Sequence, residues 1–315
     1  MSIKEWTKFG VLSLLWGSSF LWIKIVIAET GPFTLVTFRV LLAVSGVLVI
    51  VLWRRPAWPG PAFLPVFLVL GLINTALPFT LISFSEQYIS SGMASILNST
   101  VPLFTIMIAP IFVRDDPFTV PKAIGLLVGF AGIVILVSDH LRDGFNEQMV
   151  GLGAMLLAAF FYAASGVYAR RTTQGLTPEV QTLGQLVMAL LIITPAAFVV
   201  EAPFTPPALP ISWVALSWLG LLGTAAGTLI YYSLLHSIGP TRTLSVTYLF
   251  PLVGVLLGAL FLGEHVAWQH AVGGGLIISG VWIVNQTKGS LRVLPAALHD
   301  RIISGNKPHT GKLHE

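Results

Sequence analysis

The sequence predicts an all-α integral membrane protein with ten transmembrane helices, arranged as two inverted five-helix repeats around a central cavity. Three observations predict this fold: an apolar composition, ten apolar runs of spanning length, and a repeated pattern of polar residues and proline. Of the 315 residues, 55% are apolar and only 10% are charged, and the mean hydropathy is +0.86. Soluble domains carry about 25% charged residues, so lipid is the expected surrounding of most of this chain.

The composition also argues against several classes of function. The chain has no cysteine, which excludes disulfides, thiol catalysis and thiolate metal sites. The formal net charge is +4, but the basic residues lie between apolar runs without an aromatic-basic motif, so nucleic acid is not an expected partner. No P-loop pattern of glycine and lysine argues for direct use of ATP. Glu264, His265 and His270 lack metalloprotease spacing, and we expect neither a metal nor a cofactor.

Five apolar runs in the first half are long enough to cross the hydrocarbon core, which takes about 20 helical residues. They lie at 8–28, 33–53, 63–84, 92–113 and 119–138. The first run is long and lacks a small-residue cleavage pattern, so we interpret it as a span and not as a signal peptide. The short connections suit turns between helices: E-T-G-P at 29–32, R-R-P at 54–56 and R-D-D-P at 114–117.

Five further runs follow in the second half. They lie at 150–169, 179–200, 212–236, 243–262 and 267–285. Their connections are also short, as in S-I-G-P at 237–240, and none could hold a soluble catalytic domain. The tail at 291–315 is polar and basic, and we expect it to be disordered in the cytoplasm.

The distribution of Lys and Arg predicts the orientation in the membrane. With the N-terminus in the cytoplasm, 14 of the 17 basic residues fall on the cytoplasmic side and only Arg142 falls on the other. The remaining two, Lys24 and Arg39, lie within spans. This asymmetry follows the positive-inside rule. We therefore predict a multi-pass protein of the cytoplasmic (inner or plasma) membrane with both termini in the cytoplasm.

The two halves of the chain carry matching residues at nearly constant spacing. Pro102 pairs with Pro251 at a spacing of 149 residues, and Trp16 pairs with Tyr162 at a spacing of 146. One change in loop length within a duplicated sequence accounts for both values. We predict two repeats, residues 1–140 and residues 147–290.

Five spans per repeat is an odd number, so the second repeat must enter the membrane from the opposite side. Inverted repeats recur in secondary transporters, where they provide two conformations open to opposite sides of a site near the midplane. A duplicated structural protein without transport activity is the alternative.

Four stretches of the chain carry a family resemblance. They are W-G-S-S-F at 16–20, F-R-V-L-L-A at 38–43, E-Q-Y-I-S-S-G-M-A-S-I-L-N-S-T-V-P-L-F-T at 86–105, and L-F-P-L-V-G-V-L-L-G-A-L-F-L-G-E at 249–264. Through them the chain resembles the EamA-type family of the drug/metabolite transporter (DMT) superfamily over nearly its whole length. The resemblance implies ten helices in two inverted halves around a cavity. It also implies movement of small metabolites, often the export of amino acids, without a nucleotide.

Two apolar spans carry polar residues and a proline near their centres. Pro102 and Pro251 would each remove a backbone hydrogen bond and kink the helix, and the freed carbonyl needs a partner away from lipid. We predict that both kinks face the bundle interior. The polar residues beside them are then candidates for solute binding: Asn98, Ser99, Thr247 and Tyr248. The alternative is a purely structural kink that these side chains repair.

Aromatic side chains are expected to form the walls of the cavity. Trp16 and Tyr162 are each followed by small residues in mid-span, where neighbouring helices approach closely. Tyr231 lies deep in the eighth span, where its hydroxyl needs a partner. Asn74 and Phe79 of the third span complete the predicted solute-binding set. Packing against lipid is the alternative for the aromatic residues.

Arg39 lies within the second span, where an arginine costs roughly 2.5–3.5 kcal/mol on insertion scales. Glu86, at the end of the third span, is its expected partner, and the pair could bind a zwitterion or respond to protonation. A structural ion pair or an arginine that reaches the interface is the alternative. Gln185 holds the equivalent position in the second repeat, so a charge function would not be symmetric. Lys24 is expected to extend outward to the interface.

Together these features predict a secondary transporter that works by alternating access and exports amino acids or related neutral or zwitterionic solutes. The proton is the candidate coupling ion, and the expected partners are the small solute and the lipid bilayer. Ser99 and Val101 stand where aromatic amino-acid exporters of the family carry aromatic residues, which argues against that specialisation. The alternative is an integral membrane enzyme acting on a lipid or peptide. We do not expect an enzyme, because the spans contain no converging acids or nucleophile–base pair.

Overall fold

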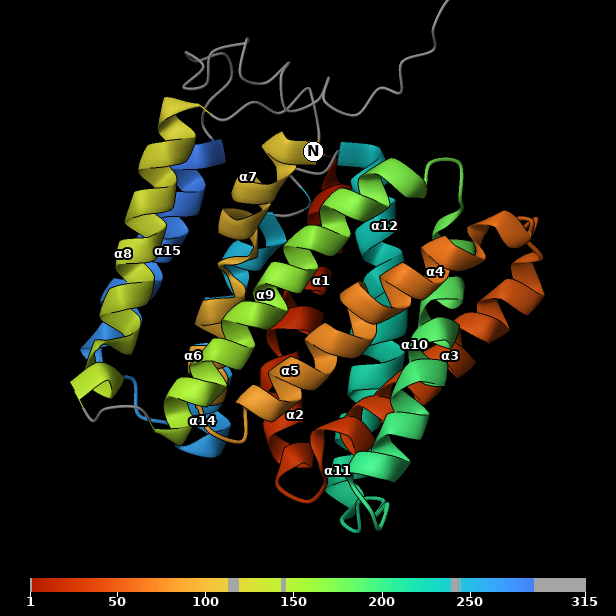
Figure 1. The fold of residues 1–315 in the computed structure, drawn as a ribbon, viewed down its shortest axis with the longest axis horizontal. Coiled ribbons are helices and arrows are strands. Elements are labelled where there is room, and N and C mark those ends of the chain that lie inside the picture. Colours follow the sequence, from red (N-terminus) through yellow and green to blue (C-terminus); the bar gives the residue numbers. More distant parts are fainter. Residues whose placement is uncertain (1, 113–118, 143–145, 239–242, 244, 286–315) are drawn as a thin grey trace, which may run out of the picture.

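The computed structural model describes residues 2–112, 119–142, 146–238, 243 and 245–285. Over these residues the regular structure is helical, as predicted (Figure 1). The predicted tail at 291–315 lies outside the described residues, as do the connections at 113–118 and 239–242.

Eight helical stretches are long and apolar enough to cross a membrane. They are Ile3–Ile27, Pro32–Arg54, Pro61–Ser85, Ser91–Ala109, Val120–Ser138, Glu147–Thr172, Pro178–Val200 and Pro210–Leu234. These stretches overlap the first eight predicted runs, which confirms a multi-pass membrane protein. The ninth and tenth runs correspond to a shorter apolar helix, Val246–Leu262, and to a helix of 18 residues, Trp268–Asn285. The count of ten spans therefore stays a prediction.

Several of these stretches consist of more than one helical segment. The helices of the first half are α1 (Ile3–Gly17), α2 (Ser19–Ile27), α3 (Pro32–Arg54), η1 (Pro61–Phe63), α4 (Leu64–Leu70), η2 (Gly71–Ala76), α5 (Leu77–Ser85), α6 (Ser91–Asn98), α7 (Val101–Phe112) and α8 (Val120–Arg142). Those of the second half are α9 (Glu147–Thr172), α10 (Pro178–Val200), α11 (Pro210–Ser217), η3 (Trp218–Ala226), α12 (Gly227–Ile238), η4 (Ser245–Leu249), α14 (Phe250–Leu262) and α15 (Trp268–Asn285).

Local sequence explains where many helices begin. Proline occupies the first position of α3, α10 and α11, where its fixed φ suits the helix and its missing N–H is not needed. At the start of α1, Ser2 and Glu5 form a capping box, with a 2.6 Å hydrogen bond from the Ser2 N–H to Glu5 Oε2.

The prolines of the two interrupted spans do not kink continuous helices. The fourth span breaks at residues 99–100, and Pro102 is the second residue of the new helix α7. In the ninth stretch the 3₁₀ helix η4 precedes α14, of which Pro251 is the second residue. In the first turn of a helix a proline removes no intrahelical hydrogen bond. The expected mid-helix kink is therefore a break between two helical segments in both places.

Two π-helical segments interrupt the third and eighth stretches. They are η2 (Gly71–Ala76) and η3 (Trp218–Ala226). At the spacing of 149 residues that relates Pro102 to Pro251, η2 falls on residues 220–225, inside η3. A π-helical turn widens the helix and shifts its side chains, and such turns are frequent at functional sites.

Close helix pairs hold the bundle together. The pair formed by α8 and α15 lies along one side (Figure 1). A Cβ atom on Gly132 of α8 would lie only 2.6 Å from the Gly273 carbonyl oxygen of α15, so this crossing requires glycine. Elsewhere α3 packs on α10, α5 on α9 and α6 on α14.

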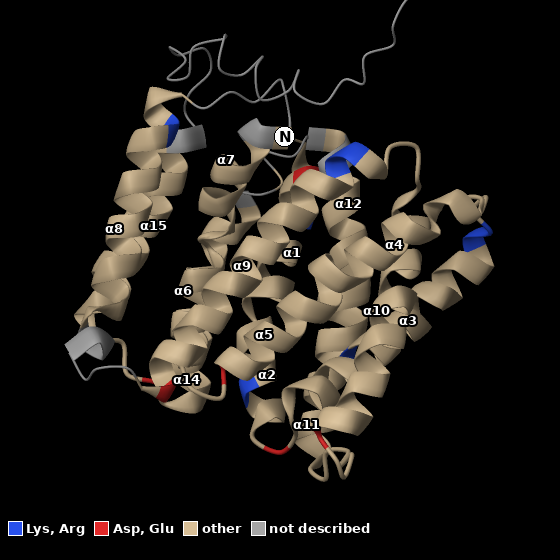
Figure 2. Cartoon of the chain, viewed as in Figure 1, with Lys and Arg blue, Asp and Glu red and all other residues tan. Residues whose placement is uncertain are grey.

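Charged residues gather at the two ends of the bundle. Figure 2 shows Lys and Arg mostly at the end where the N-terminus lies, and Asp and Glu mostly at the opposite end. We call the second end, which contains Glu29, Glu201 and Glu264, the acidic end.

Candidate functional site

Arg39 of α3 is buried at the meeting point of helices from both halves. Its side chain is 5% exposed, and its Nε donates a 2.9 Å hydrogen bond to Thr224 Oγ1 in η3. The guanidinium carbon lies 3.9 Å from the centre of the Phe79 ring of α5, a cation–π contact. Phe79 is 9% and Thr224 2% exposed, so the cation is enclosed. Among the described residues, no carboxylate forms an ion pair with it.

The expected direct pair between Arg39 and Glu86 is not formed. Glu86 directly follows α5 and is fully buried, yet neither carboxylate oxygen has a hydrogen-bond partner among the described residues. Burial raises the pKa of this carboxyl well above its ordinary value, against the opposing effects of Lys24 and Arg39. Arg39 does not contact Glu86 and influences it only through its charge, since the guanidinium is engaged by Thr224 and Phe79.

The side chain of Lys24 in α2 lies elsewhere than expected. Its Nζ does not extend to the interface but donates hydrogen bonds to the backbone carbonyls of Glu86 and, at 2.9 Å, Ile89. The turn between α5 and α6 supplies these acceptors because its carbonyls are not used by a helix. The ammonium group therefore fastens this turn to α2.

Gln185, the counterpart of Arg39 in the second half, belongs to a neutral hydrogen-bond network. Gln185 of α10 accepts a 3.2 Å hydrogen bond from Asn74 Nδ2 in η2, and Ser165 Oγ of α9 donates to Asn74 Oδ1 at 2.7 Å. Arg39 and Gln185 thus each contact the π-helical segment of the other half. Asn74, a predicted solute-binding residue, already uses both ends of its amide within the protein.

An aromatic cluster lies beside the Arg39 site. Trp16 Nε1 donates a 2.8 Å hydrogen bond to the carbonyl of Gly223, the neighbour of Thr224. The ring centre of Trp16 lies 5.4 Å from that of Tyr231 and 6.1 Å from that of Phe250. A Cβ atom on residue 227, a glycine, would approach Trp16 Nε1 to 2.6 Å, so the indole needs glycine at this position.

Tyr162 of α9 also belongs to this region. It is half-buried, packs against the core, and lies near Arg39. The structure therefore brings together five of the predicted residues around two polar anchors, Thr224 and the Gly223 carbonyl. The five are Trp16, Arg39, Phe79, Tyr162 and Tyr231.

The polar side chains beside the two prolines differ in their surroundings and hydrogen bonds. Asn98 is 6% exposed and its Oδ1 atom has no partner among the described residues, whereas Ser99 Oγ donates to the Ile96 carbonyl at 2.6 Å. Thr247 is buried. The Tyr248 hydroxyl donates to the Val281 carbonyl of α15 at 3.3 Å. Adjacent residues of the 3₁₀ helix η4 project on different faces, which directs Tyr248 toward α15.

Three carboxylates at the acidic end cap the starts of helices far away in the sequence. Glu201 accepts from the Phe33 and Thr34 N–H groups, both at 2.8 Å. Glu264 accepts from Ser91 at 2.7 Å and Gly92 at 3.0 Å. A carboxylate at a helix N-terminus satisfies unpaired N–H groups and the helix dipole.

Glu29 is the third of these carboxylates. It accepts hydrogen bonds from Ser212 Oγ and from the Ala208 and Leu209 N–H groups at the start of α11. These hydrogen bonds, first that of Ser212, lower the pKa of Glu29 below its ordinary value. Sequence reasoning missed all three caps, because each partner lies more than 160 residues away and no local pattern predicts it.

Thr224 and Ser165 were also missed as site residues. The repeat contained a signal for Thr224, since it matches Thr75 at the spacing of 149. Ser165 follows Tyr162 by one helical turn, but only the fold shows that it meets Asn74.

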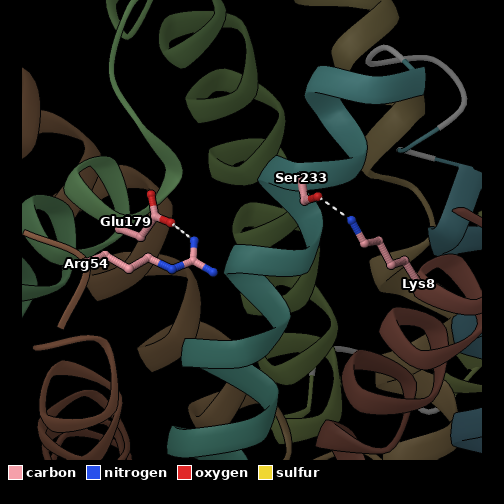
Figure 3. A network of polar contacts seen from close by, with 4 residues as sticks. All are labelled: Lys8, Arg54, Glu179 and Ser233. Carbon is pink, nitrogen blue, oxygen red and sulfur yellow. Dashed lines mark hydrogen bonds and ion pairs between the residues drawn. The ribbon is translucent and has the colours of Figure 1, made fainter. Parts of the chain in front are cut away.

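At the end opposite the acidic one, two polar contacts join the halves (Figure 3). Lys8 Nζ donates to Ser233 Oγ at 2.6 Å, linking α1 to α12. Arg54 pairs with Glu179, linking the end of α3 to the start of α10. Contacts between the halves are therefore present at both ends of the bundle.

A pocket of about 530 Å³ lies elsewhere, between residues 58–67 and α10. Its lining is mostly apolar and includes Trp58, Phe67 and Met188. None of the predicted site residues lines it.

Comparison with known proteins agrees with this architecture. The chain is 23% identical over 289 residues to an uncharacterized transporter of Archaeoglobus fulgidus, covering 90% of this chain and 99% of the relative. It is 25% identical over 279 residues to the uncharacterized inner membrane transporter YedA of Escherichia coli, covering 88% of this chain and 89% of the relative.

A crystal structure shares the fold, with a TM-score of 0.65 at 17% identity, covering 89% of this chain and 96% of the other. The model of the EamA-like transporter family matches the chain twice, at residues 9–138 and 149–286. These two matches take in nearly all of the helical core, and the chain therefore belongs to the EamA-like transporter family.

Proposed function

We propose that this protein is a secondary transporter that exports amino acids or related neutral or zwitterionic solutes by alternating access. Membership of a transporter family and relatives named as transporters support the general class. The observation that carries the proposal is Arg39. Its guanidinium is buried between the halves with a single hydrogen bond and no carboxylate partner among the described residues.

The chemistry of the Arg39 region suits an amino acid. A guanidinium presents five N–H donors in a fork that matches a carboxylate, and within the described part of the chain only Nε donates a hydrogen bond. Trp16, Tyr162 and Tyr231 supply aromatic surface for the rest of the solute. Asn98 Oδ1, a buried acceptor without a partner among the described residues, is available to a solute N–H group.

Two inverted repeats would supply the conformational change. The two family matches and the paired π-helical segments support a duplication, with repeats near 1–140 and 147–290. In this proposal the caps formed by Glu29, Glu201 and Glu264 close the acidic end. The contacts of Lys8 and Arg54 hold the other end (Figure 3). In this proposal that end and the two termini face the cytoplasm.

Reconstitution into liposomes tests the proposal. Uptake of a mixture of radiolabelled amino acids is measured with and without a pH gradient. We expect uptake above that of empty liposomes, lost in Arg39→Gln, which copies Gln185 of the other half, and retained in Arg171→Gln, an exposed control. Absence of uptake by well-folded wild-type protein, together with turnover of a lipid substrate, would replace transport by the enzymatic alternative.

A further inference from the structure

We propose that Glu86 is the proton-binding site of the transport cycle: its carboxyl is protonated while enclosed and exchanges its proton with water when the acidic end opens. The inference rests on the transport function proposed above and names the group through which a proton gradient would act. It is carried by the position of Glu86, by its lack of partners, and by the contacts that enclose it.

The burial of Glu86 is unlike that of the other acids at this end. Glu29, Glu201 and Glu264 each accept hydrogen bonds from two backbone N–H groups. Glu86 is fully buried, and both of its oxygens lack a partner among the described residues. An enclosed carboxylate without hydrogen bonds is far more costly to bury than the protonated acid.

Charged groups face Glu86 from three other elements. Lys24 of α2 and Arg39 of α3 favour its ionised form, and Glu264, which follows α14, favours the protonated form. The helix α9, which packs on α5, contributes the phenol of Tyr162, which lies near Arg39. Burial outweighs these neighbours and raises the pKa of Glu86.

The contacts around Glu86 suggest how it would be exposed. Lys24 fastens the turn that contains Glu86, and Glu264 fastens the start of α6 directly after that turn. Opening of the acidic end must separate α14 from α6 or α2 from the turn, and either movement admits water to the carboxyl. Exposure removes the desolvation, so the carboxyl can then exchange its proton with the water on that side.

The same reasoning predicts the form of coupling. The closed state is accessible only when the charge of Glu86 is compensated, either by a proton or by the ammonium group of a zwitterion whose carboxylate is held at Arg39. Proton and solute then compete for one carboxylate. An inward proton gradient would in this way drive solute outward, in agreement with export.

The proton site is tested first without any solute. Infrared spectra of the protein in lipid vesicles are recorded over a pH titration, and the carbonyl stretch of protonated carboxylic acids is followed. We expect a band that persists well above the ordinary titration range of glutamate, is lost in Glu86→Gln, and is retained in Glu201→Gln. An unchanged band in Glu86→Gln, or a titration in the ordinary acidic range only, would overturn the inference.

A transport measurement gives an independent test. In liposomes with radiolabelled amino acids, Glu86→Gln is expected to lose accumulation driven by the pH gradient and to keep exchange of labelled for unlabelled solute. Glu86→Asp, which keeps an ionisable group, should retain some response to the gradient. Gradient-driven accumulation in Glu86→Gln equal to that of wild type refutes the proton site. If wild type transports none of these solutes, the proposed function fails, and the infrared titration still decides on Glu86.

Discussion

Replacement of Arg39 by glutamine separates stability from function most clearly. A buried arginine at mid-span costs roughly 2.5–3.5 kcal/mol on insertion scales. Its contact with the Phe79 ring contributes about 0.5–2 kcal/mol of stabilisation. Its hydrogen bond to Thr224 contributes about 1.5–3 kcal/mol of stabilisation. The unfavourable free energy of burying the arginine and the stabilisation by its two contacts nearly cancel. Arg39→Gln should therefore change the free energy of unfolding by no more than about 2 kcal/mol in either direction.

Transport should respond differently from stability. Without the guanidinium, the solute carboxylate loses a charge-assisted, bidentate partner, and exchange should fall at least tenfold, which corresponds to about 1.4 kcal/mol. Thermal unfolding in detergent and labelled amino-acid exchange in liposomes are measured on the same preparations. Arg39→Lys keeps the charge without the planar fork and should recover only part of the exchange. A loss of exchange that merely parallels a loss of folded protein would refute the reasoning and make Arg39 a structural residue.

Three further predictions concern the surroundings of the site. Trp16→Phe removes the donor to the Gly223 carbonyl in η3 and should lower the free energy of unfolding by about 1–3 kcal/mol, measured by thermal denaturation. Gly132→Ala should destabilise the α8–α15 pair by about 1–3 kcal/mol, whereas Gly153→Ala, with open space around its Cβ, should be nearly neutral in the same measurement. Because hydrogen bonds depress the pKa of Glu29, its contribution to stability is present above the unfolded-state pKa and lost as the pH falls through the lower folded-state value, so thermal stability in Glu29→Gln should depend less on acid pH.

Each of these predictions has an outcome that contradicts it. Unchanged stability in Trp16→Phe would mean that the Gly223 carbonyl finds another donor. Equal shifts for the two glycine variants would show that helix propensity, and not the close approach of the helices, determines the effect. An acid transition of Glu29→Gln identical to that of wild type would assign the acid sensitivity to other carboxylates.

The positions of spans that depend only on neighbouring residues were predicted well. The run at 33–53 became Pro32–Arg54 and the run at 179–200 became Pro178–Val200, because hydropathy, length and an initial proline act within one segment. The pairing of Arg39 with Glu86 was wrong as a direct contact. Its actual partner, Thr224, lies 185 residues away in a π-helical segment that the local sequence did not predict.

The sequence by itself determined that this is a helical membrane protein of the EamA-like transporter family, because composition, span length and family stretches are properties of the chain alone. Only the tertiary structure decided that Arg39 rests on Phe79, that Pro102 and Pro251 begin helices, and that Glu86 is enclosed without a partner. The physical reason is that these helices are apolar on nearly every face. Hydropathy then predicts that a segment crosses the membrane but not which side meets its neighbours, and packing between distant segments makes that choice.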